Sequence, residues 1–452
     1  MSRGQNGLFG VVEGFYGKPW SAGQRRTLFG WLQEGGLNAY LYAPKDDARH
    51  RAVWREPYKA AEAAELAALI RDCRQHGLQF VYALSPGLDI VFTRASDLEA
   101  LRAKLQQVHD LGARDFAILF DDINPNLAEA DRQRFGTPAA AQAFVGNEVL
   151  RWARDGDAGA RVLFCPTEYC GRFAEPSVAA SPYLRTLGEQ LAPEVHVLWT
   201  GPEIISETIP VASIRELQGV LRRKPMLWDN LHANDYDLRR LYLGPYAGRT
   251  GALMDEISGI LQNPNCQFEA NVVAARTLGA YVRDPAGYAP KVAHAEALAA
   301  WLPAFKSRGG RAFTLADLQL AADIFHLPTE HGDLAARYLA DLRVILHTSP
   351  NAWGEVAARV TETTRQIVAI YEKCTELADR PLMYALYAHL WEIKENAILV
   401  GEWMRWRQKN PEAKAPFSST GFRPKIYRGG FTAALERLMP MDDEGRFNTC
   451  VS

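Results

Sequence analysis

The chain has 452 residues, which is long for one ordinary domain and about right for a large barrel followed by a smaller unit. Its composition, 48% hydrophobic and 23% charged, is that of a globular protein with enough apolar material for a sizeable core. The formal net charge of -2 excludes a strong field that would draw the chain onto nucleic acid or an anionic membrane surface.

Short β-rich segments alternate with helical segments over the first two-thirds of the chain. The expected strands are LFGVVEGFYG (8–17), NAYLYAP (38–44), QFVYALSPG (79–87), RDFAILFDD (114–122), RVLFCPTEYC (161–170), VHVLWTG (195–201), PMLWDN (225–230) and EISGILQNP (256–264). The expected helices cover 21–34, with Ser21 as its cap, and 60–77, 97–111, 139–154 and 270–283. Eight strands alternating with helices predict an α/β fold of the (β/α)8, TIM-like barrel type over residues 5–287.

The residues that follow the strands favour a barrel over a doubly wound sheet. The strands end in EGFYG, APKDD, SPG, FDD, PTEYC, WTG, WDN and QNPN. Polar groups and glycines gathered at the carboxyl ends of strands are what the catalytic face of a barrel requires. A doubly wound sheet would place a Gly-rich phosphate loop after its first strand, and EGFYGKPW has the wrong glycine spacing for one.

From residue 288 to residue 452 the pattern changes to helices at a period of 3.6, which predicts a C-terminal helical domain with an irregular tail from about residue 411. This domain has two interpretations. It covers apolar barrel surface, or residues such as Arg405 and Arg423 line a groove for the part of a substrate that lies beyond the reacting group.

The strongest chemical signal is the adjacent pair Asp121 and Asp122 at the end of an apolar strand. Two crowded carboxyls do not both ionise easily, which leaves one anion and one acid, the combination that glycoside hydrolysis uses. Consecutive side chains of an extended chain diverge, so the pair suits substrate-assisted chemistry better than direct attack by one carboxylate. The same pattern is also found in helix caps and metal sites.

The motifs together resemble a known family. The segments are GVVEGFYGKPW (10–20), YLYAPKDD (40–47), FVYALSPGLDI (80–90), FAILFDDI (116–123), FCPTEYCGRF (164–173), WTGPEI (199–204), WDNLHANDYD (228–237) and NPNCQFEAN (263–271). In this order they are similar to the signature segments of glycoside hydrolase family 84, the family of O-GlcNAcase and hyaluronidase-like β-N-acetylglucosaminidases. The resemblance covers about 8–285, the whole expected barrel.

The resemblance implies a role for ten residues. Asp121 would orient and polarise the 2-acetamido group, and Asp122 would act as general acid and then general base. Substrate-binding roles are implied for Gly14, Lys45, Tyr169, Thr200, Trp228, Asn230, Asp235 and Asn263. The resemblance implies a retaining exo-β-N-acetylglucosaminidase that works through an oxazoline intermediate. It would act on a β-GlcNAc-bearing glycoconjugate or glycoprotein and use no cofactor and no metal.

Three other functions compete with this interpretation. The first is a hydrolase of hyaluronan or another amino-sugar polymer, against which a pI of about 6.6 argues because a polyanion requires a basic groove. The second is a non-catalytic GlcNAc-binding module. The third is a metal-dependent deacetylase, for which Asp229, His232, Asp235 and Asp237 are candidate ligands.

The sequence also bears on where the protein works. The six cysteines lack the spacing of a zinc site, which favours unpaired thiols in a reducing compartment. MSRGQNGLFGVVEG has no apolar region or cleavage site of a secretory signal, and the apolar runs are too short to cross a bilayer. We therefore expect a cytoplasmic protein with no membrane or nucleic-acid partner.

Overall fold

The structure is a computed structural model that describes residues 7–419, 421–422, 428–442 and 445–447. By internal contacts the chain divides into two compact units. The barrel unit comprises the residues up to Ala335 together with Lys373–His389, and the helical unit comprises Ala336–Glu372 and the residues from Leu390 onward. The predicted division into 5–287 and 288–452 stays a prediction about domain organisation.

The barrel unit contains eight parallel strands in a closed ring, in the order of the chain. The strands are β1 (Leu8–Glu13), β2 (Ala39–Tyr42), β3 (Gln79–Leu84), β4 (Asp115–Leu119), β5 (Val162–Cys165), β6 (His196–Trp199), β7 (Met226–Asp229) and β8 (Gly259–Gln262). Strand β1 closes the ring, because Gly10 is in register with Ala39 of β2 and with Leu261 of β8. The predicted (β/α)8 fold is therefore confirmed.

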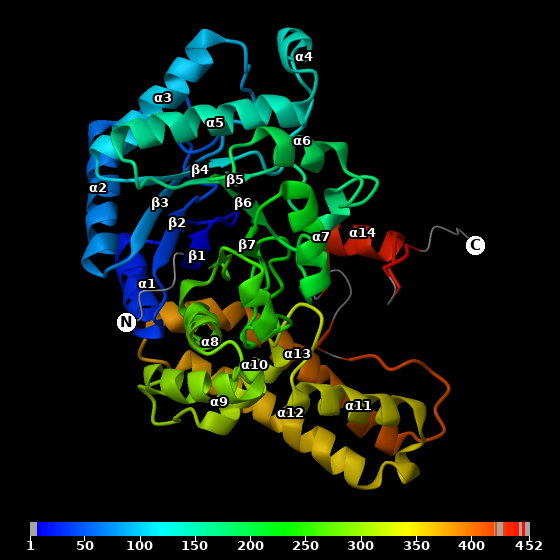
Figure 1. The fold of residues 1–452 in the computed structure, drawn as a ribbon. Helices are drawn as coiled ribbons and strands as arrows, with labels where there is room; N and C mark the ends of the chain where they lie inside the picture. The colour runs from blue at the N-terminus through cyan, green and yellow to red at the C-terminus, as the bar shows by residue number, and fades with distance from the viewer. Residues whose placement is uncertain (1–6, 420, 423–427, 443–444, 448–452) are drawn as a thin grey trace. The chain divides into compact units, whose positions relative to one another are not determined.

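Helices surround the strands (Figure 1). They are α1 (Ala22–Gly35), α2 (Ala60–Gln75), α3 (Ala95–Asp110), α4 (Glu129–Phe135), α5 (Pro138–Gly156), α6 (Pro182–Gln190), α7 (Val211–Leu221) and α8 (Val272–Arg283). The predicted cap at Ser21 is confirmed, since its side chain accepts the backbone N–H of Gln24 and the Gln24 side chain accepts that of Ser21. Helices α4, α6 and α7 were not predicted, because 7, 9 and 11 residues give too few turns for a clear period.

Two apolar layers hold the barrel together. The inner layer fills the barrel with side chains such as Leu41, Val81 and Leu119. The outer layer lies between strands and helices and includes Tyr40 and Phe116, which alternate with inward-facing neighbours. This alternation leaves the strand ends as the place where polar side chains can gather.

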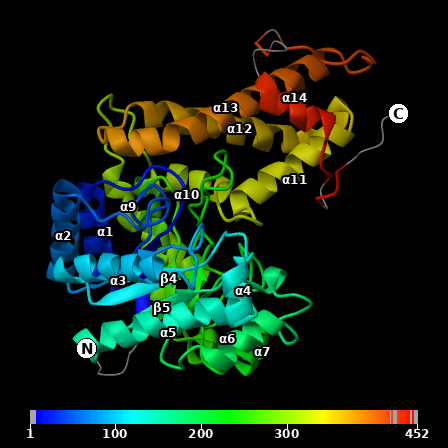
Figure 2. The same ribbon diagram turned by 90° about the horizontal axis from the view of Figure 1, so that it is seen from above.

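The helices after the barrel are α9 (Pro290–Trp301), α10 (Leu315–Ile324), α11 (Asp333–His347), α12 (Gly354–Thr375), α13 (Arg380–Lys409) and α14 (Gly430–Leu438). Helices α9 and α10 belong to the barrel unit, and α11, α12 and α13 contribute residues to both units. The helical unit has its own core of Ile345, Trp353, Val360 and Met404. Within this unit the rings of Tyr371 on α12 and Trp391 on α13 lie 5.6 Å apart, and Figure 2 shows the two helices side by side.

Several expectations for this part of the chain can now be placed. Arg405 is an exposed residue of α13, whereas Arg423 lies outside the described residues. Helix α14 lies within the tail that was left unassigned. The five cysteines that the structure describes are unpaired, and Cys450 lies outside the described residues. Among described residues, no helix combines the length and apolar character needed to cross a membrane.

Candidate active site

A cavity of about 320 Å³ opens among the loops that follow the barrel strands, and all ten residues singled out from the sequence line it. These residues are Gly14, Lys45, Asp121, Asp122, Tyr169, Thr200, Trp228, Asn230, Asp235 and Asn263. They follow every strand of the ring except β3, apart from Trp228, which lies within β7. The closed ring therefore brings together side chains up to 249 positions apart, from residue 14 to residue 263. A cavity of this size accommodates one small, mostly enclosed ligand.

Asp121 forms a buried ion pair with Lys45. The Lys45 Nζ lies 2.6 Å from Asp121 Oδ2, and the Lys45 side chain is 4% exposed. Burial alone would raise the pKa of the Asp121 carboxyl, but the Lys45 ammonium and then the Arg51 guanidinium hold it below its usual range. Asp121 is therefore an anion at neutral pH. Lys45, which could have been a solvated charge, is instead the counter-ion of the first aspartate.

The other carboxylate oxygen of Asp121 is a free acceptor. Asp121 Oδ1 is buried and has no hydrogen-bond partner among the described residues. A buried acceptor without a donor is unfavourable by about 1–3 kcal/mol, so native proteins rarely keep one without use. The site thus presents an anionic oxygen to a donor that enters the cavity.

Asp122 differs from Asp121 in surroundings and in backbone shape. Its carboxylate accepts hydrogen bonds from the hydroxyl of Tyr169 at 2.9 Å and from that of Tyr16 at 3.3 Å. The residue is exposed at the mouth of the cavity. Its φ of 48° lies in the left-handed region. The chain therefore leaves the extended conformation at Asp122, and for this reason the two consecutive side chains, expected to diverge, both reach the cavity.

A chain of hydrogen bonds fixes which atoms Asn230 and Asn263 present. The Trp228 indole can only donate, and its Nε1 lies 3.1 Å from Asn230 Oδ1, so that atom is the oxygen of the amide. Asn263 Nδ2 donates to the same oxygen at 3.0 Å. Asn263 Oδ1 remains, buried and without a donor among the described residues. The cavity thus offers a second free acceptor, suited to a hydroxyl.

Asp235 connects two loops at the rim. Its Oδ2 accepts the backbone N–H of Tyr16 at 2.8 Å, which ties the loop after β7 to the loop after β1. On the opposite side Thr200 donates from Oγ1 to Glu203 O at 2.8 Å and so shapes the loop that carries Ile204. Aromatic and apolar side chains of Tyr169, Trp228 and Ile204 provide the walls.

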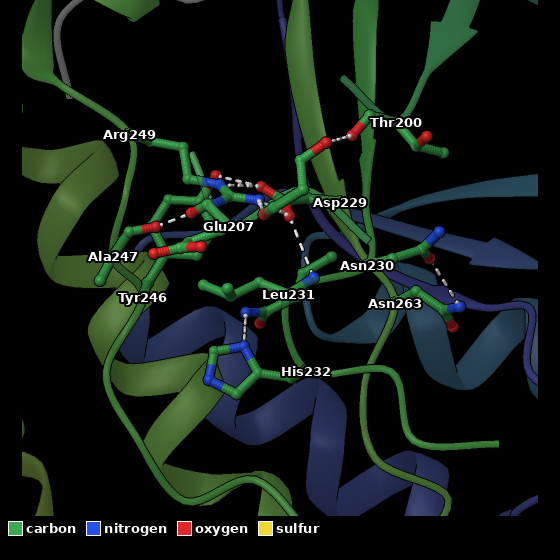
Figure 3. Close-up of polar contacts among 12 residues, drawn as sticks. Thr200, Glu207, Asp229, Asn230, Leu231, His232, Tyr246, Ala247, Arg249 and Asn263 are labelled. Carbon is green, nitrogen blue, oxygen red and sulfur yellow. Dashed lines mark hydrogen bonds and ion pairs between the residues drawn. The ribbon is translucent and has the colours of Figure 1, made fainter. Parts of the chain in front are cut away.

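A second buried ion pair lies beneath this wall. Arg249 donates to both carboxylate oxygens of Asp229, at 2.6 and 2.8 Å, and Tyr246 donates to Oδ2 at 2.7 Å. Arg249 also donates to the carbonyl oxygens of Ser206 and Glu207, so it holds the loop after β6 against the end of β7 (Figure 3). This bidentate network supports the position of Asn230, the neighbour of Asp229.

The four candidate ligands of a metal site have separate partners. His232 donates from Nε2 to Gly244 O and accepts from Gln262 at Nδ1, and burial lowers its pKa to about 4. Asp229 pairs with Arg249, and Asp237 pairs with Arg239. Within the part of the chain that the structure describes, no three His, Cys, Asp or Glu side chains gather as metal ligands. These contacts engage Asp229, His232 and Asp237 with separate partners, while Asp235 lies at the rim of the cavity, so the four side chains do not converge on one point.

Sequence reasoning missed several residues of the cavity. Tyr16, Ile204, Ile205 and Tyr236 also line it. Tyr16 and Tyr236 stand in segments already singled out, EGFYG and WDNLHANDYD, so the motifs contained the signal although no role was assigned. Arg51 does not line the cavity but donates to Asp122 O at 3.0 Å, and nothing in DDARHRAVW indicates this contact.

Comparisons with known proteins show which family the chain resembles. A family model described as beta-N-acetylglucosaminidase matches residues 9–313. Protein O-GlcNAcase of Rattus norvegicus and that of Mus musculus are each 51% identical to the chain over 276 residues, which is 61% of this chain and 30% of each relative.

A solved structure is similar over a larger share of the chain. It is a mutant of the O-GlcNAc hydrolase of Thermobaculum terrenum, and it matches with a TM-score of 0.79 at 28% identity, covering 89% of this chain and 84% of that one. The chain spans about 30% of the length of the rat and mouse relatives, so their whole-protein activities are not transferred with the match. Because the family model covers more than half of the residues, including every cavity residue described above, the chain belongs to the beta-N-acetylglucosaminidase family of glycoside hydrolases, as its motifs indicated.

Proposed function

We propose that the chain is a retaining exo-β-N-acetylglucosaminidase that uses the acetamido group of its substrate as the nucleophile. The observation that carries the proposal is the unpartnered buried oxygen of Asp121, whose other oxygen is held by Lys45. A 2-acetamido sugar supplies the donor that this anion lacks, an amide N–H. A hydrogen bond from that N–H to a carboxylate increases the electron density on the amide oxygen, which makes it a better nucleophile.

The reaction then proceeds in two displacements. In the first, the acetamido oxygen forms a bond to the anomeric carbon, the glycosidic C–O bond breaks, and Asp122 gives its proton to the leaving oxygen. In the second, Asp122 takes a proton from water, the water oxygen bonds to the anomeric carbon, and the oxazoline ring opens. Two inversions restore the β configuration. The two tyrosine hydroxyls, from Tyr16 and Tyr169, orient the Asp122 carboxylate during both proton transfers.

The remaining cavity residues recognise one terminal sugar. Asp235 and Asn263 present acceptors to ring hydroxyls, and the Gly14 backbone lies where a side chain would occupy this space. Trp228, Tyr169 and Thr200 enclose the acetyl methyl group. A volume of about 320 Å³ is consistent with cleavage at a chain end, because it holds one sugar and leaves the remainder outside.

We propose β-GlcNAc on Ser or Thr of proteins as the natural substrate, supported by the names of the rat and mouse relatives, each a protein O-GlcNAcase. Hyaluronan fits less well. The cavity contains the carboxylates of Asp121, Asp122 and Asp235 against the single ammonium of Lys45, and this balance repels uronate groups.

We further propose that the protein works in the cytoplasm. The support comes from its cysteines, four of which are buried thiols, Cys73, Cys165, Cys170 and Cys374, each with a pKa raised chiefly by burial. Such thiols are typical of a reducing compartment.

The proposed function is tested by two experiments. The first compares release of a phenol from aryl β-GlcNAc, β-glucoside and β-GalNAc substrates, with and without a chelator. Turnover of the β-glucoside at a similar rate would contradict acetamido participation, and loss of activity in chelator would favour a metal enzyme.

The second experiment separates the aspartates. In Asp122→Asn, kcat/KM should fall by about 10²-fold or more for substrates with poor leaving groups and much less for acidic phenols, which hardly need protonation. In Asp121→Asn it should fall for both classes, because every leaving group depends on the acetamido attack. Equal leaving-group dependence in the two variants would mean that the roles are wrongly assigned.

A further inference from the structure

The conformation of Asp122 needs an explanation that its side-chain contacts do not supply. Only three non-glycine residues in the described ranges have a positive φ, and Asp122, at 48°, is the one in the cavity. A left-handed conformation is unfavourable for an L-residue because Cβ approaches the following carbonyl oxygen, although Asp tolerates it better than most. Such residues persist where surrounding groups hold the backbone, and they concentrate at functional sites.

Arg51 is the side chain that holds this backbone. Its Nη2 donates to the carbonyl oxygen of Asp122 at 3.0 Å, and its Nη1 donates to Ser85 Oγ at 3.1 Å. Ser85 follows strand β3, and its own N–H donates to His50 O at 2.9 Å. The planar guanidinium thus bridges the loops after β2, β3 and β4 with both of its terminal nitrogens engaged.

Arg51 is buried although it forms no ion pair within the described part of the chain, which is unusual for an arginine. The residue is 8% exposed, and no carboxylate among the residues that the structure describes forms an ion pair with it. Neighbouring Arg55 on the same loop, by contrast, pairs with Asp89 and Asp97. The guanidinium donates its hydrogen bonds to two neutral oxygens, and its charge acts on Asp121 only at longer range, where it lowers the pKa of that carboxyl. Burial of a cation with these partners carries a desolvation cost, so a purely structural role would be better served by a paired or apolar side chain.

We propose that Arg51 is a positioning residue for the general acid: by holding the Asp122 carbonyl it maintains the left-handed turn that directs the Asp122 carboxyl into the cavity. This inference rests on the proposed role of Asp122. Without the guanidinium the carbonyl loses its donor and the backbone relaxes toward negative φ. The carboxyl then moves away from the hydroxyls of Tyr169 and Tyr16, which lie 2.9 and 3.3 Å from it. Misplacement of a catalytic group by about 1 Å lowers a rate by about 10²-fold.

The test is the leaving-group dependence of Arg51→Met, measured as kcat/KM over a series of aryl β-GlcNAc substrates. A misplaced acid lowers the rate most where protonation of the leaving group matters. We expect a loss of about 10²-fold for poor leaving groups and less than about 5-fold for dinitrophenol, so the variant resembles Asp122→Asn in slope. Arg51→Lys keeps the charge but presents its donors from a single nitrogen, without the planar fork that spans the two acceptors, and its slope should be intermediate.

Arg55→Met is the matched control, because it removes a guanidinium from the same loop that contacts neither aspartate. It should lower the melting temperature without changing the slope. Equal losses on all substrates in the Arg51 variants would overturn the proposal even if Asp122→Asn shows the slope. If Asp122→Asn shows no slope, the assignment of the acid is wrong and the inference fails with it. Should Arg51→Met not fold, the slope of Arg51→Lys decides, since an unchanged slope in that variant overturns the proposal.

Discussion

The ion pair between Lys45 and Asp121 makes a strong prediction about pH. In Lys45→Met the Asp121 carboxylate would remain buried without its counter-ion, a change that is unfavourable by about 3–5 kcal/mol. Because about 1.36 kcal/mol corresponds to a tenfold change in a protonation equilibrium, a cost of this size raises the pKa of Asp121 well above its wild-type position, which Lys45 holds low. Asp121 would then bind a proton in the pH range where the wild type holds it as the anion.

The assay is kcat/KM for an aryl β-GlcNAc substrate between about pH 4 and 9, a range that begins near the pKa of an ordinary carboxyl group. Because the anion accepts the substrate N–H, the acid limb of the profile should move upward by about two pH units in Lys45→Met. A uniform decrease in kcat/KM with an unmoved acid limb would refute the reasoning, since it would mean that Lys45 only binds the sugar.

The contribution of Asp121 to the free energy of unfolding should depend on pH with opposite sign in the wild type and in Lys45→Met. In the wild type the folded-state pKa of Asp121 is depressed, so the stabilisation is present above the unfolded value of about 3.9 and is lost as the pH falls through the lower folded value. In Lys45→Met the folded pKa is raised, so stability should decline as the pH rises above about 4. Lys104→Met is the control: it removes another buried ammonium, which donates to Arg49 O, and should leave the acid limb in place.

Three further predictions follow from the cavity. Replacing the substrate N-acetyl by progressively fluorinated acetyls should slow turnover steeply, and a flat rate series would rule out acetamido participation. The product should be the β-anomer by NMR, and a thiazoline mimic of the cyclised intermediate should bind tightly. Gly14→Ala should raise KM by about tenfold or more, because a Cβ would stand 2.3 Å from Trp228 Cζ2 and force the indole into the acetyl site; an unchanged KM would show that the ring yields freely. Asp229→Asn should lower the free energy of unfolding by about 3–5 kcal/mol in denaturant titrations because it breaks the buried pair with Arg249, whereas Glu34→Gln, in an exposed pair, should change it by less than about 1 kcal/mol.

Sequence reasoning predicted the parts of the fold whose causes are local. Strands such as 115–119 are continuous apolar runs, and the polar residues that follow them must meet at one end of a closed barrel, which is where Asp121 and Asp122 lie. The other eight cavity residues were named from the resemblance of the motifs to a known family. The cap at Ser21 is equally local. These features depend on residues a few positions apart.

What the sequence did not predict depends on contacts between distant segments. The left-handed turn at Asp122 is held by Arg51, 71 positions earlier, and Tyr16 reaches Asp122 across 106 positions. Neither contact could be predicted from residue type, because Arg and Tyr are common on the surface loops of many proteins. The backbone conformations of single residues at the site are therefore set by the assembled barrel, and the pattern of apolar and polar residues does not predict them.

The closure of the barrel by β1 and β8 has a consequence for how the enzyme acquires activity during folding. These strands pair across about 250 positions of sequence, for example Gly10 with Leu261, and loop closure over such a distance is a slow step. Gly14 lies just beyond one of them and Asn263 just beyond the other, so the sugar site has no complete wall until that step is finished. A nascent chain ending before β8 carries both aspartates and still lacks a binding site. Recovery of turnover after dilution from denaturant should accordingly lag behind recovery of helical circular dichroism, and the return of activity would report that β1 and β8 have paired.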